Sequence, residues 1–296
     1  MKKNLTFKRV TEVLTEKITS SVKLNRYFHL PSWDYQKEIV LKSILPDDIV
    51  LDIGSGNNPI NRANILADFS PDDNFHRSGK LKEDRPVIVC SVERIPIKQK
   101  TIDFVLCSHV LEHVNNPSIA CGELQRIARK GYIETPAYGK DILIGTGYMH
   151  KWQVVSFEGT MNFFEYSKRE QQANWNASPV MKLWMRKRFH PWQKYFWERQ
   201  DLFNAWILWE DRFEFSEHRR KNSEVKKLSE WKRIPDSLLP NVTFSLTENE
   251  IKLLEKILTT PDGKYSMLFS GENFIHEASN IVYPVRGKRV YVEMGI

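Results

Sequence analysis

The chain has 296 residues, 41% of them apolar, and a formal net charge of +7 from 44 basic and 37 acidic side chains. This composition supplies a packed core for one large domain, or for one domain with an appendage, and it excludes a disordered chain. No apolar run approaches the roughly 20 residues that span a bilayer, and the basic start lacks the apolar centre of a signal peptide, so we expect a cytoplasmic protein.

The first 45 residues are predicted to be helical. Apolar residues recur at helical spacing between Phe7 and Tyr27, and a second helix is predicted from about Asp34 to Leu45. Pro46 ends this second helix. We therefore expect residues 1–45 to form N-terminal helices that pack on a core beginning at residue 46.

The first predicted strand runs into a glycine loop. A β-branched run over residues 49–53 is followed by Gly54, Ser55 and Gly56. Glycine permits positive φ and lets another molecule approach the backbone, and the N–H groups of such a loop can face an anionic group. A single glycine loop is a weak signal, so its meaning depends on the strands that follow.

Three further apolar runs each end in polar residues. They span Leu66 to Ser70, Pro86 to Ser91 and Ile102 to His109. Such runs are typical of strands buried on both faces of a parallel sheet, whose carboxyl ends meet at one edge. Only eleven residues separate Gly56 from Asp68, so the crossover between the first two strands must be short.

The next elements are predicted to be a helix, a fifth strand and a hairpin. Pro117 starts a helix that runs to about Lys130, and Gly131 is expected to end it. Residues 132–134 form the fifth strand. A hairpin over residues 151–167 is expected to complete a seven-stranded sheet.

Several motifs in this region occur in the order known from one enzyme family. They are Asp52-x-Gly54-x-Gly56, Asp68-x-Ser70, Ile95-Pro96, Ile102-Asp103-Phe104, His109-Val110-Leu111-Glu112-His113-Val114 and Gly131-Tyr132-Ile133-Glu134-Thr135-Pro136. From about Asp47 to Ser167 the chain resembles the class I S-adenosyl-L-methionine (SAM)-dependent methyltransferases, and most of all the methyltransferase type 11 group. The resemblance implies an α/β core over residues 46–168, a Rossmann-like seven-stranded methyltransferase sheet with helices on both faces, and SAM as cofactor.

The resemblance also implies which residues hold the methionine and ribose portions of SAM. Gly54, Ser55 and Gly56 would face the methionine portion, while Asp52 would organise the loop or meet the amino group. Asp68 would accept hydrogen bonds from the ribose hydroxyls.

Ser91, Val92 and His109 complete the implied cofactor site. Ser91 follows the third strand, where the family usually carries an acid that accepts the adenine amino group, so weaker binding is expected. His109 would lie beside the cofactor. A dinucleotide is the competing ligand, but Pro59 replaces the third glycine of that fingerprint.

Two histidines are the candidate catalytic residues. A hydroxyl acceptor needs a base, and His113 or His150 could serve, because neutral imidazole accepts protons near pH 7. A structural histidine bonded to the backbone is the alternative for each. Glu134 and Tyr138 are further candidate acceptor contacts.

No metal site is expected from the sequence. The run from His109 to His113 matches the zinc-protease pattern H-x-x-E-H, but that pattern requires a helix, and His109 ends a predicted strand. The cysteines, Cys90, Cys107 and Cys121, are odd in number and lack ligand spacing, which predicts buried free thiols.

Residues 169–296 are predicted to form an aromatic-rich, mainly helical extension with a few strands near the C-terminus. Its aromatic residues lie near one helical face among arginines and lysines: Trp184, Phe189, Trp192, Phe196, Phe203, Trp206 and Phe213. The simpler interpretation is a helical face packed on the core. The alternative is a surface for a glycan, a nucleic acid or a lipid headgroup, the last giving a peripheral membrane contact.

The sequence therefore predicts a SAM-dependent methyltransferase acting on an oxygen of a sugar, glycan or other small metabolite. A methyltransferase-fold binding or scaffold protein without turnover is the first alternative, because of Ser91 and the unusual C-terminal third. A nucleic-acid methyltransferase is the second, because most surplus positive charge lies between Lys182 and Arg233. The lack of an Asn-Pro-Pro-Tyr-type motif after the fourth strand argues against it. The oligomeric state is not predicted.

Overall fold

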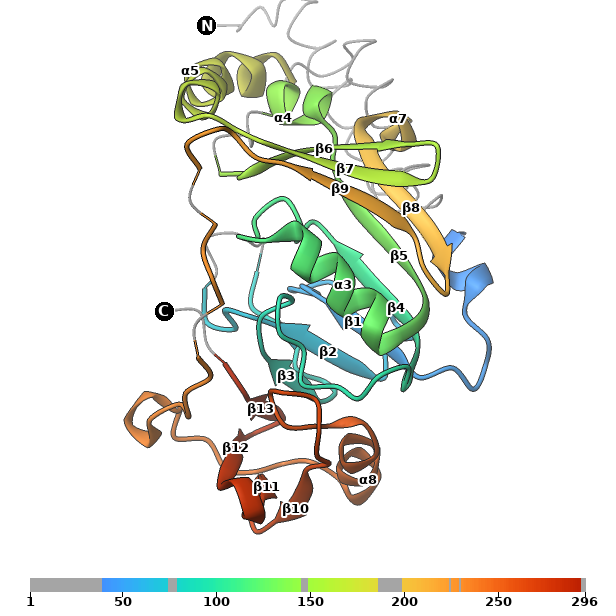
Figure 1. Cartoon of the computed structure of the whole chain (residues 1–296), viewed down its shortest axis with the longest axis vertical. Helices are drawn as coiled ribbons and strands as arrows, with labels where there is room; N and C mark the ends of the chain where they lie inside the picture. Colours follow the sequence, from blue (N-terminus) through green and yellow to red (C-terminus); the bar gives the residue numbers. More distant parts are fainter. Residues whose placement is uncertain are drawn as a thin grey trace, which may run out of the picture.

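The protein is described by a computed structural model over residues 39–73, 79–144, 149–185, 199–223, 225–228 and 230–293 (Figure 1). Residues 39–43 are helical, in agreement with the second predicted N-terminal helix. The helix predicted between Phe7 and Tyr27 lies outside the described residues.

A ten-stranded sheet forms the centre of the molecule, in the order β10-β11-β12-β13-β3-β2-β1-β4-β5-β8. Its middle is parallel and consists of β1 (Val50–Ile53), β2 (Ile65–Asp68), β3 (Val87–Val89), β4 (Ile102–Ser108) and β5 (Ala128–Pro136). The order β3-β2-β1-β4-β5 is that of a doubly wound Rossmann-like sheet. The predicted α/β fold class is thus confirmed.

Both faces of this parallel sheet are apolar, as its sequence predicts. Alternate residues of a strand point to opposite faces, so Val50 and Phe104 belong to one core cluster, whereas Leu51 and Val105 belong to the other. Helix α3 (Pro117–Ile127) contributes Ala120, Cys121, Leu124 and Ile127 to the second cluster. Cys90, Cys107 and Cys121 are buried and free, as expected.

Gly131 does not end the helix as the sequence suggested. Helix α3 ends at Ile127, and β5 begins directly at Ala128, so Gly131 lies inside a central strand. A Cβ atom there would lie 2.5 Å from the carbonyl oxygen of Val105 and 2.9 Å from the ring of Trp209. Glycine is therefore required at this position by close packing on both sides of β5.

Gly131→Ala is expected to destabilise the fold by about 2–3 kcal/mol, because the added methyl group overpacks the sheet. Gly122 in α3 is the matched control, since a Cβ there meets nothing within 4 Å. Gly122→Ala should be neutral or stabilise by up to about 1 kcal/mol through helix propensity. Urea unfolding of both variants measures the difference, and equal stabilities would contradict the packing argument.

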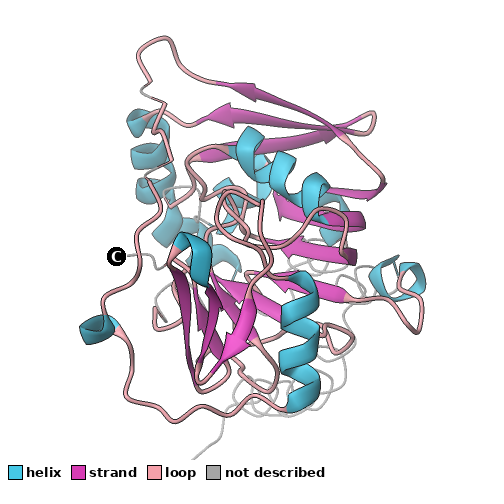
Figure 2. Ribbon diagram, turned by 60° about the horizontal axis from the view of Figure 1, so that its bottom comes forward, coloured by secondary structure: helices cyan, strands magenta, loops and turns pink. Residues whose placement is uncertain are grey.

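A second, three-stranded sheet consists of β6 (Trp152–Phe157), β7 (Thr160–Glu165) and β9 (Glu214–His218). The predicted hairpin thus exists, but it does not complete the large sheet. The edge of β5 is instead taken by antiparallel β8 (Asn204–Glu210), and four C-terminal strands extend the opposite edge, so the sheet has ten strands rather than seven. The small sheet lies beside α3 (Figures 1 and 2), and Glu217 accepts the N–H of Ser118.

The C-terminal third contains more strand than the sequence suggested. Its described elements are α5 (Lys168–Met185), α7 (Gln200–Phe203), β8, β9, α8 (Glu248–Ile257), β10 (Leu268–Ser270), β11 (Asn273–His276), β12 (Ile281–Arg286), β13 (Arg289–Tyr291) and two short 3-10 turns, at Asp236–Leu238 and Glu277–Ser279. Because β13 pairs with β3 in parallel, residues 268–291 extend the large sheet. The strands predicted near the C-terminus are confirmed by β10 to β13.

Two aromatic residues of the predicted helical face have partners inside the protein. Trp206 stacks on Tyr132 with ring centroids 6.0 Å apart, and buried Phe213 lies 5.3 Å from Trp209. The side chains of Trp184, Phe189, Trp192 and Phe196 lie outside the described set. Both residues therefore pack inside the protein, but the predicted helical face is wrong, since Trp206 lies in β8 and Phe213 lies outside any helix.

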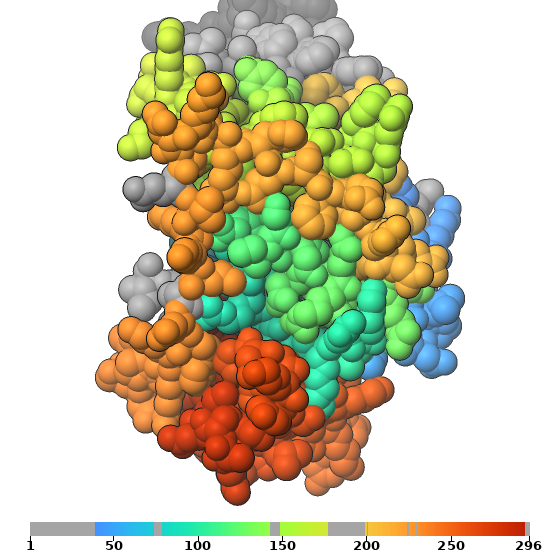
Figure 3. Space-filling view, viewed as in Figure 1, coloured from blue at the N-terminus to red at the C-terminus, as the bar shows by residue number. Residues whose placement is uncertain are grey.

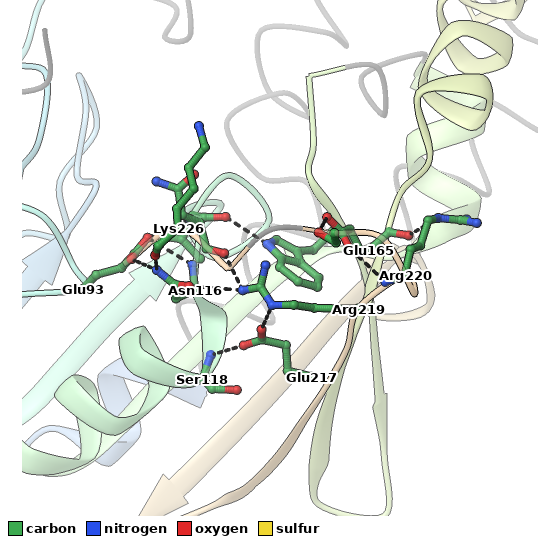
Figure 4. Close-up of polar contacts among 12 residues, drawn as sticks. Glu93, Asn116, Ser118, Glu165, Glu217, Arg219, Arg220 and Lys226 are labelled. Atoms are coloured by element: carbon green, nitrogen blue, oxygen red, sulfur yellow. Dashed lines mark hydrogen bonds and ion pairs between the residues drawn. The ribbon is translucent and has the colours of Figure 1, made fainter. Parts of the chain in front are cut away.

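The chain after β9, called here the basic segment, begins with Arg219 and Arg220 and runs along one side of the molecule toward the C-terminal strands (Figure 3). Its arginines contact the core (Figure 4). Arg219 donates to the carbonyl oxygen of Asn115 and lies 5.0 Å from the ring centroid of Trp152, and Arg220 donates to Glu165. Arg219 and Arg220 therefore stabilise contacts between separate segments of the chain.

Candidate active site

The loop after β1 has the shape expected of a ligand-binding loop. Gly54 and Gly56 adopt φ values of +69° and +54°, which glycine accepts without strain. The N–H of Gly54 donates to the carbonyl oxygen of Ala67 at 2.8 Å, which ties the loop to β2. The hydroxyl oxygen of Ser55 is buried and has no hydrogen-bond partner in the described part of the chain. The loop therefore offers a polar group to a ligand.

Asp52 fastens this loop from within the sheet. Its side chain is 3% exposed, and Oδ2 accepts the N–H of Ile60 at 2.8 Å. Burial raises the pKa of Asp52 to about 7, although the N–H of Ile60 and the charge of Arg85 act in the opposite direction. The hydrogen bond from Ile60 is consistent with the loop-organising role that the sequence suggested for Asp52.

Asp52 should make the unliganded protein less stable as pH rises. The carboxyl binds its proton more tightly in the folded state than in the unfolded state, so its stabilisation is present at acidic pH and is lost as pH rises through about 7. Between pH 5.5 and 8 this amounts to a loss on the order of 2 kcal/mol. Asp52→Asn keeps an acceptor for Ile60 and should flatten this dependence. Unfolding at both pH values measures it, and an unchanged slope would contradict the assignment.

Asp68, Ser91 and Val92 lie at the ends of two neighbouring strands. Asp68 ends β2 and its backbone pairs with β3, where the N–H of Cys90 donates to its carbonyl oxygen. Oδ1 of Asp68 accepts the N–H of Ser70, and Oγ of Ser91 accepts the N–H of Glu93. Val92 is buried. The predicted ribose and adenine residues therefore come together at the carboxyl edge, and their binding roles stay predictions.

His109 follows β4 with φ of +58°, a left-handed conformation that a residue other than glycine adopts only when its surroundings hold it there. Its Nδ1 lies 3.6 Å from Oε1 of Glu112, and its Nε2 lies 3.4 Å from Oε1 of Glu134. Burial and Lys140 act to lower the pKa of His109, but these two carboxylates outweigh them and raise it. His109 thus links the ends of β4 and β5.

The two predicted bases, His113 and His150, lie next to each other. Their ring centroids are 4.8 Å apart in an edge-to-face arrangement. His150 is 4% exposed, and its Nδ1 lies 2.7 Å from Oδ1 of fully buried Asp141, whose Oδ2 accepts the hydroxyl of Tyr166 at 2.9 Å. His113 is partly exposed. A buried carboxylate therefore lies within ion-pair distance of one of the two imidazoles, although the contact between Nδ1 and Oδ1 lacks the geometry of a regular hydrogen bond.

Glu112 joins these histidines to the glycine loop. Its carbonyl oxygen accepts the N–H groups of Lys151 and Trp152, which fixes the segment that carries His150. Two residues earlier, Val110 lies against Gly54: a Cβ atom on Gly54 would be 2.2 Å from Cγ2 of Val110. The segment that carries Glu112 and His113 thus contacts both the glycine loop and the segment that follows His150.

Sequence reasoning missed Asp141, Tyr166 and Lys140. Asp141 and Lys140 lie in α4 (Tyr138–Ile144), directly after β5, so their position at the carboxyl edge was the available signal. Burial lowers the pKa of Lys140, and its Nζ donates to Oδ1 of Asn204 at 2.6 Å. Tyr166 follows the hairpin, and nothing in the sequence indicated that it would lie beside Asp141.

The two further candidates for acceptor contact differ in exposure. Glu134 is buried and accepts the hydroxyl of Tyr132 at 2.7 Å. Tyr138 is 43% exposed, with its ring 6.4 Å from that of Tyr166. Tyr138 is therefore the more accessible of the two.

Residues 51–133 match the family model described as "Methyltransferase domain" of the Methyltransf_11 family. This segment is a type 11 methyltransferase domain. The match includes the glycine loop, Asp68, Ser91, His109 and His113, while His150 and Asp141 lie beyond it. The predicted family is thus confirmed for this part of the chain, and SAM is the cofactor of that family.

Part of the chain is similar to another protein. The chain is 36% identical over 104 residues to an uncharacterized protein of Methanocaldococcus jannaschii, covering 33% of this chain and 44% of that protein. The chain therefore spans less than half the length of this relative.

The chain is also similar to solved structures of methyltransferases. A SAM-dependent methyltransferase of Thermotoga maritima is 19% identical, with 53% of this chain and 76% of that chain covered and a TM-score of 0.29. A SAM-dependent methyltransferase of Methanosarcina mazei is 14% identical, with 46% and 80% covered and a TM-score of 0.27. Structural similarity at these TM-scores carries no argument about the fold or the function, which are supported by the family match and the strand order.

Proposed function

We propose that this protein is a SAM-dependent methyltransferase that transfers a methyl group to an oxygen of a sugar, glycan or other small metabolite. The observation that carries the choice of oxygen is the buried pair of His150 and Asp141, which faces His113 beside the glycine loop. A carboxylate that holds an imidazole in one orientation is the arrangement of a general base for a hydroxyl.

The residues of the loop fit the cofactor. Gly54 and Gly56 give the loop its left-handed turn, and the unpartnered hydroxyl of Ser55 can bond to a polar ligand. Gly54, Ser55 and Gly56 would hold the methionine portion, and Asp68 would accept hydrogen bonds from the ribose hydroxyls. Bound SAM supplies an electrophilic methyl group on sulfur.

Ser91, Val92 and His109 complete the proposed cofactor site. Ser91 and Val92 would bound the adenine, and His109 would lie at the cofactor's side toward the acceptor. The hydroxyl of Ser91 has two lone pairs, and the N–H of Glu93 uses one of them. One acceptor position therefore remains for a donor on the ligand.

The catalytic work proposed for the chain is positioning and proton transfer. With a proton on Nδ1 shared with Asp141, Nε2 of His150 is the nitrogen that can accept a proton from the acceptor hydroxyl. His113 is half-exposed and lies between this pair and solvent-accessible surface, so it is the alternative base or an acceptor contact. Holding the oxygen in line with the methyl group supplies much of the rate enhancement.

A nucleic-acid acceptor is less well supported. Arg219 donates to the carbonyl oxygen of Asn115, and Arg220 donates to that of Glu165 in β7, so both cations already have partners within the chain. No helix in the described ranges is long and apolar enough to cross a membrane. Because Arg219 and Arg220 already have partners within the chain, a small molecule or a glycan is the proposed methyl acceptor.

Calorimetric titration with SAM and with S-adenosylhomocysteine tests the proposal first. We expect micromolar binding of both, followed by methyl transfer in a screen of nucleotide sugars and glycans. No binding of either compound would overturn the proposed activity and favour a protein that keeps the fold without turnover. Salt-dependent binding of oligonucleotides would favour a nucleic-acid acceptor instead.

A further inference from the structure

Three side chains of the site are close enough to bind one metal ion. Glu112, His113 and His150 each offer a ligand atom, and these atoms all lie within 4.8 Å of one another. Nε2 of His113 is 3.8 Å from Oε1 of Glu112. Ligand atoms bound tetrahedrally at about 2.1 Å from zinc are about 3.4 Å apart, so small side-chain rotations would bring the three into coordination.

Glu112 carries a buried oxygen that the protein leaves without a partner. The residue is 1% exposed, and its Oε2 has no hydrogen-bond partner in the described residues. Burying a carboxylate oxygen without a partner is costly, and such an oxygen in a native protein calls for a bound group. A cation beside Glu112 would supply that group.

The surroundings of His150 are those of a metal-bound imidazole. Metal-bound histidines usually direct their second ring nitrogen to a carboxylate, which fixes the ring and strengthens the ligand. Nδ1 of His150 lies 2.7 Å from Asp141, and Tyr166 donates to that carboxylate in turn. Nε2 of His150 is then left for a metal.

The donor set also decides which metal fits. Two imidazoles and one carboxylate suit zinc and similar divalent transition metals, whereas magnesium and calcium prefer oxygen ligands. Three protein ligands leave a fourth position open, as in catalytic zinc sites. His109 is not among the three, so this is not the H-x-x-E-H arrangement rejected from the sequence.

We propose that Glu112, His113 and His150 form a binding site for a divalent transition metal, with Asp141 as a positioning residue. The open position would take the acceptor hydroxyl, lower its pKa and release its proton to solvent. With a metal bound, the histidines would act as ligands, and this role would replace the general-base role proposed above for His150. Activation of the acceptor hydroxyl by the metal rests on the methyl transfer proposed above. Binding of the metal does not depend on that function.

The test uses the full chain, freed of metal by a chelator and titrated with Co²⁺ and Zn²⁺. We expect one equivalent of Co²⁺ to bind with visible absorption bands typical of tetrahedral coordination, and Zn²⁺ to displace it. His113→Gln and His150→Gln should each weaken binding at least tenfold, and Asp141→Asn should weaken it by about ten- to a hundredfold. His218→Ala is the control, because His218 is an exposed histidine outside the cluster, bonded to Ser216 and stacked on Phe164.

Circular dichroism and SAM titration of each variant separate loss of the metal from loss of the fold. Absence of Co²⁺ binding by the folded wild type, or equal affinity in the wild type and the two histidine variants, would overturn the metal site. Co²⁺ binding without any SAM binding would uphold the site and overturn the proposed methyl transfer. SAM-dependent turnover that survives the chelator unchanged would overturn the catalytic role of the metal.

Discussion

Gly54→Val is expected to lose SAM binding at least a hundredfold while the protein still folds. The residue has φ of +69°, and a Cβ atom at this position would lie 2.2 Å from Cγ2 of Val110, so a side chain must displace the turn after β4. A displaced loop would no longer hold its backbone N–H groups in place for a ligand. Calorimetric titration with SAM measures the loss, and thermal unfolding checks the fold.

Gly159 provides the matched control. It adopts φ of +76° in the hairpin between β6 and β7, but a Cβ atom there would meet nothing within 4 Å. Gly159→Val therefore carries the conformational strain of a left-handed residue without the clash and far from the site. It should lower stability and leave SAM affinity unchanged. Wild-type affinity in Gly54→Val would remove this loop from the cofactor site.

The parallel core and the loop could be predicted because their signals are local. Each strand from β1 to β4 is a short apolar run buried on both faces, and Asp52 and Asp68 stand at strand ends where the carboxyl edge collects polar side chains. Positive φ at Gly54 and Gly56 follows from residue type. Such features need no knowledge of distant parts of the chain.

Other features depend on contacts between distant residues. The sequence of β8 was grouped with a helical aromatic face, yet Ile207 pairs with Ile133 of β5, because burial of Trp209 and Ile207 against the sheet outweighs local periodicity. Gly131 resembles a helix stop, and only the nearness of Val105 and Trp209 reveals why it is glycine.

The same holds for the histidine cluster. His113 and His150 could be named from residue type and from the family motif, but their contact could not. It arises because Lys151 and Trp152 donate to the carbonyl oxygen of Glu112, which brings two separate segments together. Asp141 then gains its role only through its distance to His150.

His150→Gln is expected to lower kcat at least a hundredfold while SAM affinity changes less than about twofold. The side chain is almost fully buried between Asp141 and His113, and its place lies outside the loop that would hold the cofactor. Glutamine approximates the volume and keeps hydrogen-bonding groups, so the fold should survive. Single-turnover kinetics with the identified acceptor and calorimetry with SAM separate the two effects.

Asp141 should act through His150 rather than on the acceptor. The carboxylate is fully buried and is engaged by His150 on one oxygen and by Tyr166 on the other, so it has no surface to offer a substrate. Asp141→Asn alone should therefore lower kcat by about ten- to a hundredfold. In the His150→Gln background it should cause almost no further loss, because residues that act as a unit are not additive. Additive losses in the double variant would mean that Asp141 serves a separate function, and the orienting pair would then have to be abandoned as the basis of hydroxyl activation.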